Sequence, residues 1–390
     1  MIAPGQKTVL CIGYGFAGSI FSAQFAANHA EKANATVHVV TATDYLENTT
    51  CNTLALATSN NNARLLDINK EPNVTYTVGA VESLTGDKVT VKKPDGSSIE
   101  IEFDVAVVAA GMKYPGFKSE VTHDTKEKRL QAMEEWRTKA NNAKKIVVCG
   151  GGAVGVEYAC DAKLRSPDKE VIIVHSKSNL LNTMDPTLSE FATKRCREKV
   201  GLKLFLEKKV VSNDSNSVTL DDGSVIEGVD MYVPAMAGKA STEFMPAGTT
   251  EANGCISVNE HLQSKTFKNV FAVGDCQSLV SVKTIMKIES QMDVVLANVA
   301  ATLKGESLKS YTPWFPDMQG PGLVALGHDH PKMMGLGPDL PGCFCKTFCF
   351  ACCCMGTWPC TPMISKTIAQ EKSTFNVNGL SIKPSKGMVR

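Results

Sequence analysis

Short apolar runs that end in glycine-rich turns recur along the chain. One run covers residues 8–12 and leads into Gly13, and another covers residues 146–149 and leads into Gly150. Each turn opens a helix-like segment, the first of which is expected over residues 16–30. A strand, a glycine turn and a helix in this order are typical of a βαβ unit, whose buried parallel strands are continuously apolar. The pattern therefore predicts an α/β fold.

Similar elements follow each turn in the same order, which predicts an internal repeat of about 140 residues. In the first copy we expect a strand at 36–40, short strands broken at 86–87 and 94–96, and an apolar run at 105–110. In the second copy we expect a strand at 171–175, a helix after Pro186, a turn at 221–223 and an apolar run that ends at 237–238. An amphipathic helix at 126–140, with Leu130, Met133 and Trp136 on one face, connects the two copies, and a strand at 269–273 and a helix at 283–303 follow them.

This order of elements predicts two Rossmann-like dinucleotide-binding domains with a C-terminal extension. The first domain is discontinuous and comprises residues 1–116 and 254–305. The second domain comprises residues 117–253, and the extension comprises residues 306–390.

Composition argues against several classes of protein. A net charge of +1 without a long basic block argues against nucleic-acid binding, which requires clustered Lys and Arg side chains. The first predicted strand begins at Lys7, which leaves no room for a signal or transit peptide, so we expect exposure to the cytosol. Among the fourteen cysteines, Cys11, Cys149 and Cys160 lie in predicted strands and helices. We interpret them as reduced core thiols rather than as disulfides.

Both glycine turns carry the fingerprint GxGxxG, which binds the pyrophosphate of a dinucleotide. Its glycines allow a tight turn and let the amides at a helix N-terminus approach the phosphates closely. One copy is a weak signal, whereas two copies in the same strand, turn and helix setting are specific. The glycines are Gly13, Gly15 and Gly18 in the first copy and Gly150, Gly152 and Gly155 in the second.

With three further motifs, the fingerprints resemble the two-dinucleotide-binding-domain flavoprotein reductases, which include glutathione reductase, type II NADH dehydrogenases and apoptosis-inducing factor. The motifs are Ala109-Ala110-Gly111, Ala237-Gly238 and Val273-Gly274-Asp275. The strings at 155–157, 173–176 and 257–263 are similar to the mitochondrion-associated members related to apoptosis-inducing factor. The resemblance covers residues 7–310 and implies FAD in the first domain and NADH or NADPH in the second.

The resemblance also implies individual FAD ligands. It places Thr41 at the adenosine ribose, where the family usually has an acidic residue, and Gly111 in a loop beside the cofactor. Asp275 would bind the ribityl chain or the phosphate end, although a Gly-Asp pair is also a common turn. Lys283 stands near the start of the following helix, where its charge would add to the helix dipole in stabilising the reduced flavin.

For the nicotinamide cofactor, the resemblance places Glu157 near the nicotinamide and the flavin, while a carboxylate early in a helix is also favourable by itself. A carboxylate at the end of the following strand would select NADH over NADPH. This chain has His175, Ser176 and Lys177 there, so nothing rejects NADPH. Lys177 would attract the 2′-phosphate, or it is an ordinary solvated surface residue.

The electron acceptor distinguishes the subfamilies. Disulfide reductases have a closely spaced cysteine pair after the second strand, whereas this chain has Cys51 alone. One thiol cannot cycle as an internal disulfide, which indicates a small acceptor such as a quinone, as in the type II dehydrogenases. The sequence leaves open a thiol-linked reductase that uses the tail and an NADH-sensing interaction protein.

Seven of the cysteines lie between Cys343 and Cys360, among aromatic residues. Pro341, Lys346 and Pro359 interrupt the segment too often for a membrane span. Three interpretations remain open: a lipid-contacting patch with S-acylated cysteines, a metal site, and a redox relay that uses the CxxC spacing at 349–352. We expect the first, and hence a peripheral association with a membrane, either a lipid droplet or the outer mitochondrial membrane.

Overall fold

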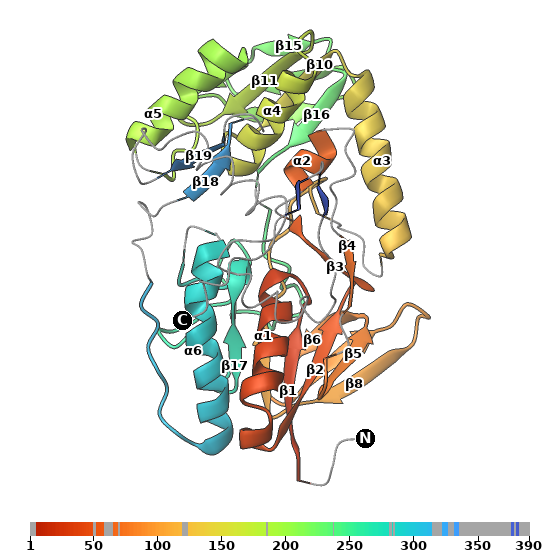
Figure 1. Cartoon of the computed structure of the whole chain (residues 1–390), viewed down its shortest axis with the longest axis vertical. Helices are drawn as coiled ribbons and strands as arrows, with labels where there is room; N and C mark the ends of the chain where they lie inside the picture. Colours follow the sequence, from red (N-terminus) through yellow and green to blue (C-terminus); the bar gives the residue numbers. More distant parts are fainter. Residues whose placement is uncertain are drawn as a thin grey trace.

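Two parallel β-sheets, each with its own glycine loop, form the framework of the computed structural model (Figure 1). The structure describes residues 5–49, 52–57, 65–68, 71–118, 124–184, 186–236, 238–280, 283, 285–313, 322–326, 331–334, 376–377 and 380–381. Figure 1 shows one sheet in the lower half of the molecule and the other in the upper half.

The first sheet has five parallel strands in the order β17–β9–β1–β2–β5. Their bounds are β1 (Lys7–Ile12), β2 (Ala35–Thr41), β5 (Val74–Val78), β9 (Val105–Val108) and β17 (Val270–Ala272). β17 pairs with β9, although the whole second sheet lies between them in the sequence. The first sheet is therefore built from two segments, one before and one after the second sheet in the chain. The domain limits given above stay a prediction.

The second sheet has four parallel strands in the order β12–β11–β10–β16. Their bounds are β10 (Lys145–Cys149), β11 (Glu170–His175), β12 (Lys203–Leu206) and β16 (Met231–Pro234). The strands β1 and β10 are almost entirely buried, as continuously apolar strands in the middle of a parallel sheet should be.

A three-stranded antiparallel sheet follows the third parallel strand of each half, β5 or β12, and the predicted turns lie between the antiparallel strands. The first comprises β6 (Ala80–Leu84), β7 (Lys88–Lys92) and β8 (Ser98–Glu102), and the second comprises β13 (Val210–Asn213), β14 (Ser217–Leu220) and β15 (Val225–Glu227). Three two-stranded pairs are formed by β3 (Tyr45–Glu47) with β4 (Leu65–Asp67), β18 (Gly322–Ala325) with β19 (Pro331–Met334), and β20 (Asn376–Val377) with β21 (Leu380–Ser381). The predicted internal repeat is confirmed.

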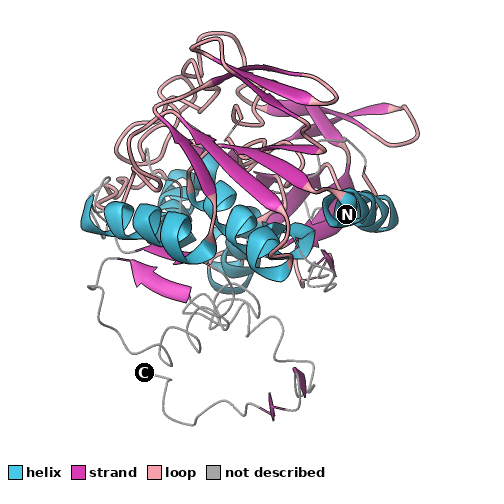
Figure 2. Cartoon of the chain, turned by 90° about the horizontal axis from the view of Figure 1, so that it is seen from above, coloured by secondary structure: helices cyan, strands magenta, loops and turns pink. Residues whose placement is uncertain are grey.

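The helices gather on one side of the large sheets (Figure 2). They are α1 (Phe16–Asn28), α2 (Asn52–Ala57), α3 (Lys126–Asn142), α4 (Ala153–Arg165), α5 (Pro186–Arg195) and α6 (Ile285–Lys304), with short 3-10 turns at Glu31–Ala33 and Gly274–Cys276 and a π-helical turn at Cys196–Val200. None of the helices within the described ranges has the length and apolar character needed to cross a bilayer.

Helix α3 buries more charge than its sequence pattern indicates. Met133 is fully buried, as expected, but Arg129 and Arg137 are buried on the same side. The Arg129 Nε atom donates to Glu47 Oε1 at 2.8 Å, and the Arg137 Nη1 atom donates to Ala55 O at 3.4 Å. These acceptors on β3 and α2 satisfy the guanidinium groups, which is why the charges are tolerated inside.

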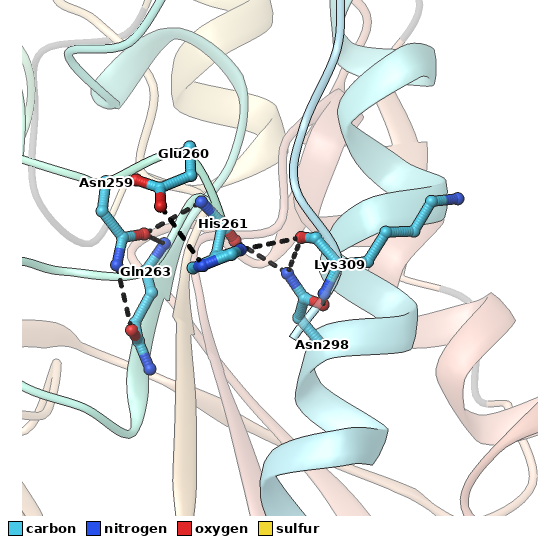
Figure 3. A network of polar contacts seen from close by, with 6 residues as sticks. All are labelled: Asn259, Glu260, His261, Gln263, Asn298 and Lys309. Carbon is cyan, nitrogen blue, oxygen red and sulfur yellow. Dashed lines mark hydrogen bonds and ion pairs between the residues drawn. The ribbon is translucent and has the colours of Figure 1, made fainter. Parts of the chain in front are cut away.

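The segment after α6 is fastened to the loop at 259–263 (Figure 3). The fully buried Asn298 of α6 donates to the carbonyl groups of His261 and Lys309 at 2.9 Å each and accepts the Lys309 amide at 2.7 Å. Asn259 Oδ1 accepts two backbone amides of its own loop. Residues 259–263, which are part of the segment 257–263 cited above for the family resemblance, thus hold the chain after α6 in place.

Further along the chain, β18 packs against α4 of the upper half. Val324 and Leu326 are fully buried and belong to the same hydrophobic cluster as Leu56 of α2 and Val156 of α4. At least this part of the predicted C-terminal extension therefore belongs to the core.

Candidate functional site

The first glycine loop lies at the carboxyl end of β1. Gly13 has a φ of +101°, and a Cβ atom there would lie 2.6 Å from the carbonyl oxygen of Ala109. A Cβ atom on Gly18 would lie 1.9 Å from Gly13 O. A Cβ atom on Gly15 would meet nothing within 4 Å. The fold itself therefore requires the outer two glycines, while the middle one faces open space.

The second loop, at the carboxyl end of β10, has the same geometry. Gly150 has a φ of +122°, and its Cβ would lie 2.6 Å from Ala235 O. A Cβ atom on Gly155 would lie 2.0 Å from Gly150 O, whereas nothing lies within 4 Å of one on Gly152. Two loops that are far apart in the sequence thus have the same feature: a tight backbone turn with free space beside its middle glycine.

Both loops suit an anionic ligand. Gly15 and Gly152 are the N-caps of α1 and α4, neither helix has a side-chain cap, and neither has an acidic residue in its first turn. The first amides of each helix therefore lack side-chain acceptors, and they add to the positive end of the helix dipole. A side chain at either N-cap would occupy the space next to these amides. Glycine leaves that space free, so each loop fits the pyrophosphate of a dinucleotide.

The carboxyl ends of β9 and β17 bring Gly111 and Asp275 to the same edge of the first sheet as the first loop. Burial raises the pKa of the Asp275 carboxyl, and the charges of Lys283 and Lys118 oppose this rise. The amide of Gly274 donates to Gln291 Oε1 of α6 at 2.8 Å, which fixes the turn that carries Asp275. A carboxylate is thus held beside two lysines at this edge.

Lys283 lies before α6, as the sequence analysis expected. Its ammonium donates to the carbonyl oxygens of Gln277, at 2.6 Å, and of Val280. The cation is therefore bound by the carbonyl groups of these two residues, and its catalytic role stays a prediction.

Thr41, at the end of β2, is buried, and only 3% of its surface is exposed. Its hydroxyl donates to Thr43 O at 3.1 Å. The next acidic residue, Asp44, accepts the amide of Lys126 at the start of α3 through its Oδ1 atom at 3.1 Å. The Thr41 hydroxyl thus bonds within the turn after β2, whereas Asp44 joins this turn to the start of α3. A ribose contact of Thr41 stays a prediction.

Glu157 meets the first half of the molecule at the junction between α2 and α4. Thr53 Oγ1 of α2 donates to Glu157 Oε2 of α4 at 3.2 Å. The structure therefore places the Glu157 carboxylate against α2, at a contact between the two predicted domains. Its role at the nicotinamide stays a prediction.

The end of β11 carries His175, and its tautomer follows from its partners. The Gly151 amide donates to Nδ1 at 3.1 Å, so Nε2 carries the proton and donates to Asn182 Oδ1 at 3.2 Å. Burial is the main cause that lowers the pKa of His175, and the charge of Lys177 adds to it. Lys177 is exposed, and no carboxylate ends this strand.

Lys118 and its neighbours were missed by the sequence analysis. The loop after β9 brings Lys118 close to Gly111, and a Cβ atom on Gly111 would lie 3.4 Å from Lys118 Nζ. Nearby, Asn52 Nδ2 and Arg129 Nε both donate to Glu47 Oε1 at 2.8 Å. No motif or periodicity marks these residues, because their partners are distant in the chain.

The six cysteines within the described residues are free and buried. They are Cys11, Cys149, Cys160, Cys196, Cys255 and Cys276. The prediction of reduced core thiols is therefore confirmed for Cys11, Cys149 and Cys160. Cys51 and the segment 343–360 lie outside the described residues.

Comparisons with known proteins agree with this geometry. The pyridine nucleotide-disulphide oxidoreductase family profile matches residues 7–301. An FAD-dependent oxidoreductase of Flammulina velutipes is 32% identical over 219 residues, which covers 54% of this chain and 66% of that protein. Ferroptosis suppressor protein 1 of Xenopus laevis is 30% identical over 262 residues, which covers 64% of this chain and 68% of that protein. The matches thus span about two thirds of these relatives.

Solved structures confirm the fold. The reduced CoADR-RHD of Bacillus anthracis has a TM-score of 0.63 at 17% identity, covering 83% of this chain and 60% of that chain. An engineered water-forming NADPH oxidase has a TM-score of 0.62 at 16% identity, covering 83% of this chain and 74% of that chain. They confirm the Rossmann-like α/β fold. The family match supports the use of FAD with NAD(P)H. The chain belongs to the pyridine nucleotide-disulphide oxidoreductase family.

Proposed function

We propose that this protein is an FAD-dependent NAD(P)H:quinone oxidoreductase. Bound FAD supplies the redox chemistry, taking a hydride from NAD(P)H and passing two electrons to an acceptor. Gly15 and Gly152 leave the loops open to the two pyrophosphates, and Asp275 offers a carboxylate at the β17 end of the first site. The contact between Thr53 and Glu157 holds the two halves together where the reacting rings would meet.

The observation that carries the choice of acceptor is the lack of a cysteine pair before α2. Cys51 is the only cysteine between Cys11 and Cys149, and it is followed directly by Asn52 and Thr53. Neither side chain is a thiol: Asn52 is hydrogen-bonded to Glu47, and Thr53 is hydrogen-bonded to Glu157. An internal disulfide cannot form there, which favours a small acceptor that reaches the flavin directly, such as a quinone.

For the nicotinamide, we propose that both NADH and NADPH are accepted. A carboxylate at the end of β11 would bind the 2′-hydroxyl of NADH and repel a 2′-phosphate. Neutral His175 stands there instead, and the exposed Lys177 follows it.

We further propose a peripheral membrane contact through residues 343–360, so that an apolar quinone is reached at the lipid surface. The support is the sequence of this segment, which combines seven cysteines with aromatic residues. Acylation of two or more cysteines would anchor the chain stably.

Steady-state NAD(P)H oxidation by the purified, FAD-loaded chain tests the acceptor. A ubiquinone analogue, oxidised thioredoxin and oxidised glutathione are compared, in the wild type and in a variant with Cys349→Ser and Cys352→Ser. We expect fast turnover with the quinone alone, unchanged in the variant. Turnover with a disulfide substrate that disappears in the variant would establish a thiol-linked reductase. A long-lived reduced flavin without turnover on any acceptor would indicate an NADH sensor.

A further inference from the structure

Lys118 is held in place by both halves of the molecule. The carbonyl oxygen of the preceding Phe117 accepts hydrogen bonds from Asn52 Nδ2 at 2.5 Å and from Arg129 Nη2 at 3.1 Å. The Lys118 amide donates to Tyr114 O at 3.0 Å. The backbone at Lys118 is therefore fixed by α2, by α3 and by its own loop.

Aromatic packing fixes the same loop from the side of the second sheet. The Phe117 ring lies 5.8 Å from that of Trp136 and 5.5 Å from that of Tyr158, and Trp136 Nε1 donates to Tyr158 Oη at 3.3 Å. A Cβ atom on Gly116 would lie 2.3 Å from the Trp136 ring. Since the loop has little freedom to move, the fold fixes the point from which the Lys118 side chain extends to reach Gly111.

The Lys118 ammonium has no hydrogen-bond or ion-pair partner among the residues that the structure describes. The carboxylates whose charge acts on it are those of Glu47 and Asp275, and Glu47 is already bonded to Arg129 and Asn52. Burial lowers the pKa of Lys118, while these carboxylates oppose the shift. A partly buried cation without a partner is costly, so an anionic ligand would stabilise it.

The strand order indicates which part of FAD this cation faces. The pyrophosphate loop follows β1, with β2 on one side and with β9 and β17 on the other. The two ends of FAD must extend in opposite directions from that loop. Lys118 and Asp275 lie on the β9 and β17 side, and Phe117 is bonded to α2, which meets α4 at the contact between Thr53 and Glu157. Because α4 begins at the second glycine loop, a nicotinamide bound there would lie close to this junction, and we therefore infer that the flavin end extends toward Lys118.

We propose that Lys118 is the side chain that binds the isoalloxazine ring of FAD and stabilises the negative charge that the ring acquires on reduction. Hydride transfer from NAD(P)H delivers two electrons and one proton and forms one new bond to hydrogen at the flavin. The neutral ring becomes an anion while the nicotinamide becomes a cation, so no further reactant is needed. Lys283, whose ammonium is bonded to the carbonyls of Gln277 and Val280, is less available for this role. The inference rests on FAD use and is independent of the quinone.

The midpoint potential of bound FAD tests this inference in the full-length holoprotein. We expect Lys118→Met to weaken the binding of reduced FAD relative to oxidised FAD about tenfold or more, which lowers the potential by about 30 mV or more. The pKa of the reduced flavin, followed by absorbance against pH, should rise as the anion loses its cation. Lys118→Arg should restore both values in large part. Lys113→Met is the matched control, because Lys113 lies in the same loop but pairs with Glu243 at the surface.

Several outcomes would overturn the proposal. One is a wild-type potential in Lys118→Met, and another is a shift of the same size in Lys113→Met. If Lys118→Met does not retain FAD, the affinities of the FAD-free protein for FAD and for ADP are compared with those of the wild type. A loss for FAD alone supports a contact with the flavin, whereas an equal loss for ADP assigns Lys118 to the pyrophosphate. Failure of quinone reduction with the potentials as expected would refute the proposed acceptor and leave this inference intact.

Discussion

Substitution of Gly152 by valine separates the needs of the ligand from those of the fold. Gly152 adopts φ −77° and ψ −178°, extended backbone that valine takes without strain, and a Cβ atom there meets nothing within 4 Å. The lost glycine cap costs a few tenths to about 1 kcal/mol. Valine also lowers the conformational entropy of the unfolded chain, which stabilises the folded protein by about 0.4–1 kcal/mol. The free energy of unfolding should therefore stay close to that of the wild type.

Binding of the nicotinamide cofactor should fall strongly in the same variant. A branched side chain at the N-cap of α4 occupies the space through which a phosphate reaches the helix amides. Each hydrogen bond to a charged group contributes about 1.5–3 kcal/mol, so the loss of two corresponds to at least a hundredfold weaker binding. FAD, bound at the other loop, should remain at full occupancy.

Anaerobic stopped-flow measurement of flavin reduction against NADH concentration is the assay. We expect an apparent Kd that rises a hundredfold or more, with a wild-type flavin spectrum and Tm. Gly155→Val is the control with the opposite signature, because its Cβ would lie 2.0 Å from Gly150 O and the variant should be destabilised. Unchanged NADH dependence in Gly152→Val would show that the second fingerprint is a structural turn only.

Three other predictions concern the FAD site, the buried ion pair and the tail. Asp275→Asn should weaken FAD binding about 10- to 150-fold, measured as flavin content and by titration, because a charged hydrogen-bond partner contributes roughly 1.5–3 kcal/mol. Burial raises the pKa of Asp275 in the folded state, so ionisation of this carboxyl destabilises the FAD-free fold. At pH 7 the asparagine variant should therefore have the larger free energy of unfolding. This difference from the wild type should shrink as the pH falls through the folded-state pKa of Asp275. Arg129→Met leaves Glu47 buried without its cation and should cost about 3–5 kcal/mol in urea unfolding; a loss below 1 kcal/mol would contradict the assigned pairing. Serine at all seven tail cysteines should move the protein from the membrane fraction to the soluble fraction while NADH oxidation with a water-soluble quinone persists; retention on membranes would exclude acylation as the anchor. These cysteines are Cys343, Cys345, Cys349, Cys352, Cys353, Cys354 and Cys360.

The parts of the fold that could be predicted from the sequence are those whose cause is local. Gly13 and Gly150 need positive φ angles, and the apolar runs before them can only be buried strands, so both βαβ units were identified correctly. The helices after residues 126 and 186 followed from periodicity and from Pro186. In each case the residues that permit the prediction lie within a few positions of the element that they predict.

The parts that could not be predicted depend on pairing across the fold. Arg129 looks like a solvated residue on an amphipathic helix, and its burial is explained by two acceptors outside the helix, Glu47 on β3 and the carbonyl oxygen of Phe117. Lys118 follows an unremarkable loop, and its significance comes from Asp275, which is more than 150 positions later in the chain. Lys283 is predicted to add its charge to the helix dipole near the flavin, and this stays a prediction; its hydrogen bonds to the carbonyl groups of Gln277 and Val280 could not be predicted from the sequence.

The contacts between the two halves connect Glu157 with the loop that carries Lys118. Phe117 carries hydrogen bonds from α2 and α3 through its carbonyl group and packs through its ring against Tyr158 of α4. On α4, Glu157 is adjacent to Tyr158 and is bonded to Thr53 of α2. A movement of α4 relative to the first sheet would therefore disturb the Glu157 contact and the loop that presents Lys118 together. Hydride transfer requires the nicotinamide and the flavin to be aligned closely. With Glu157 and Lys118 in their proposed roles, one shared set of contacts would position both sides of that alignment.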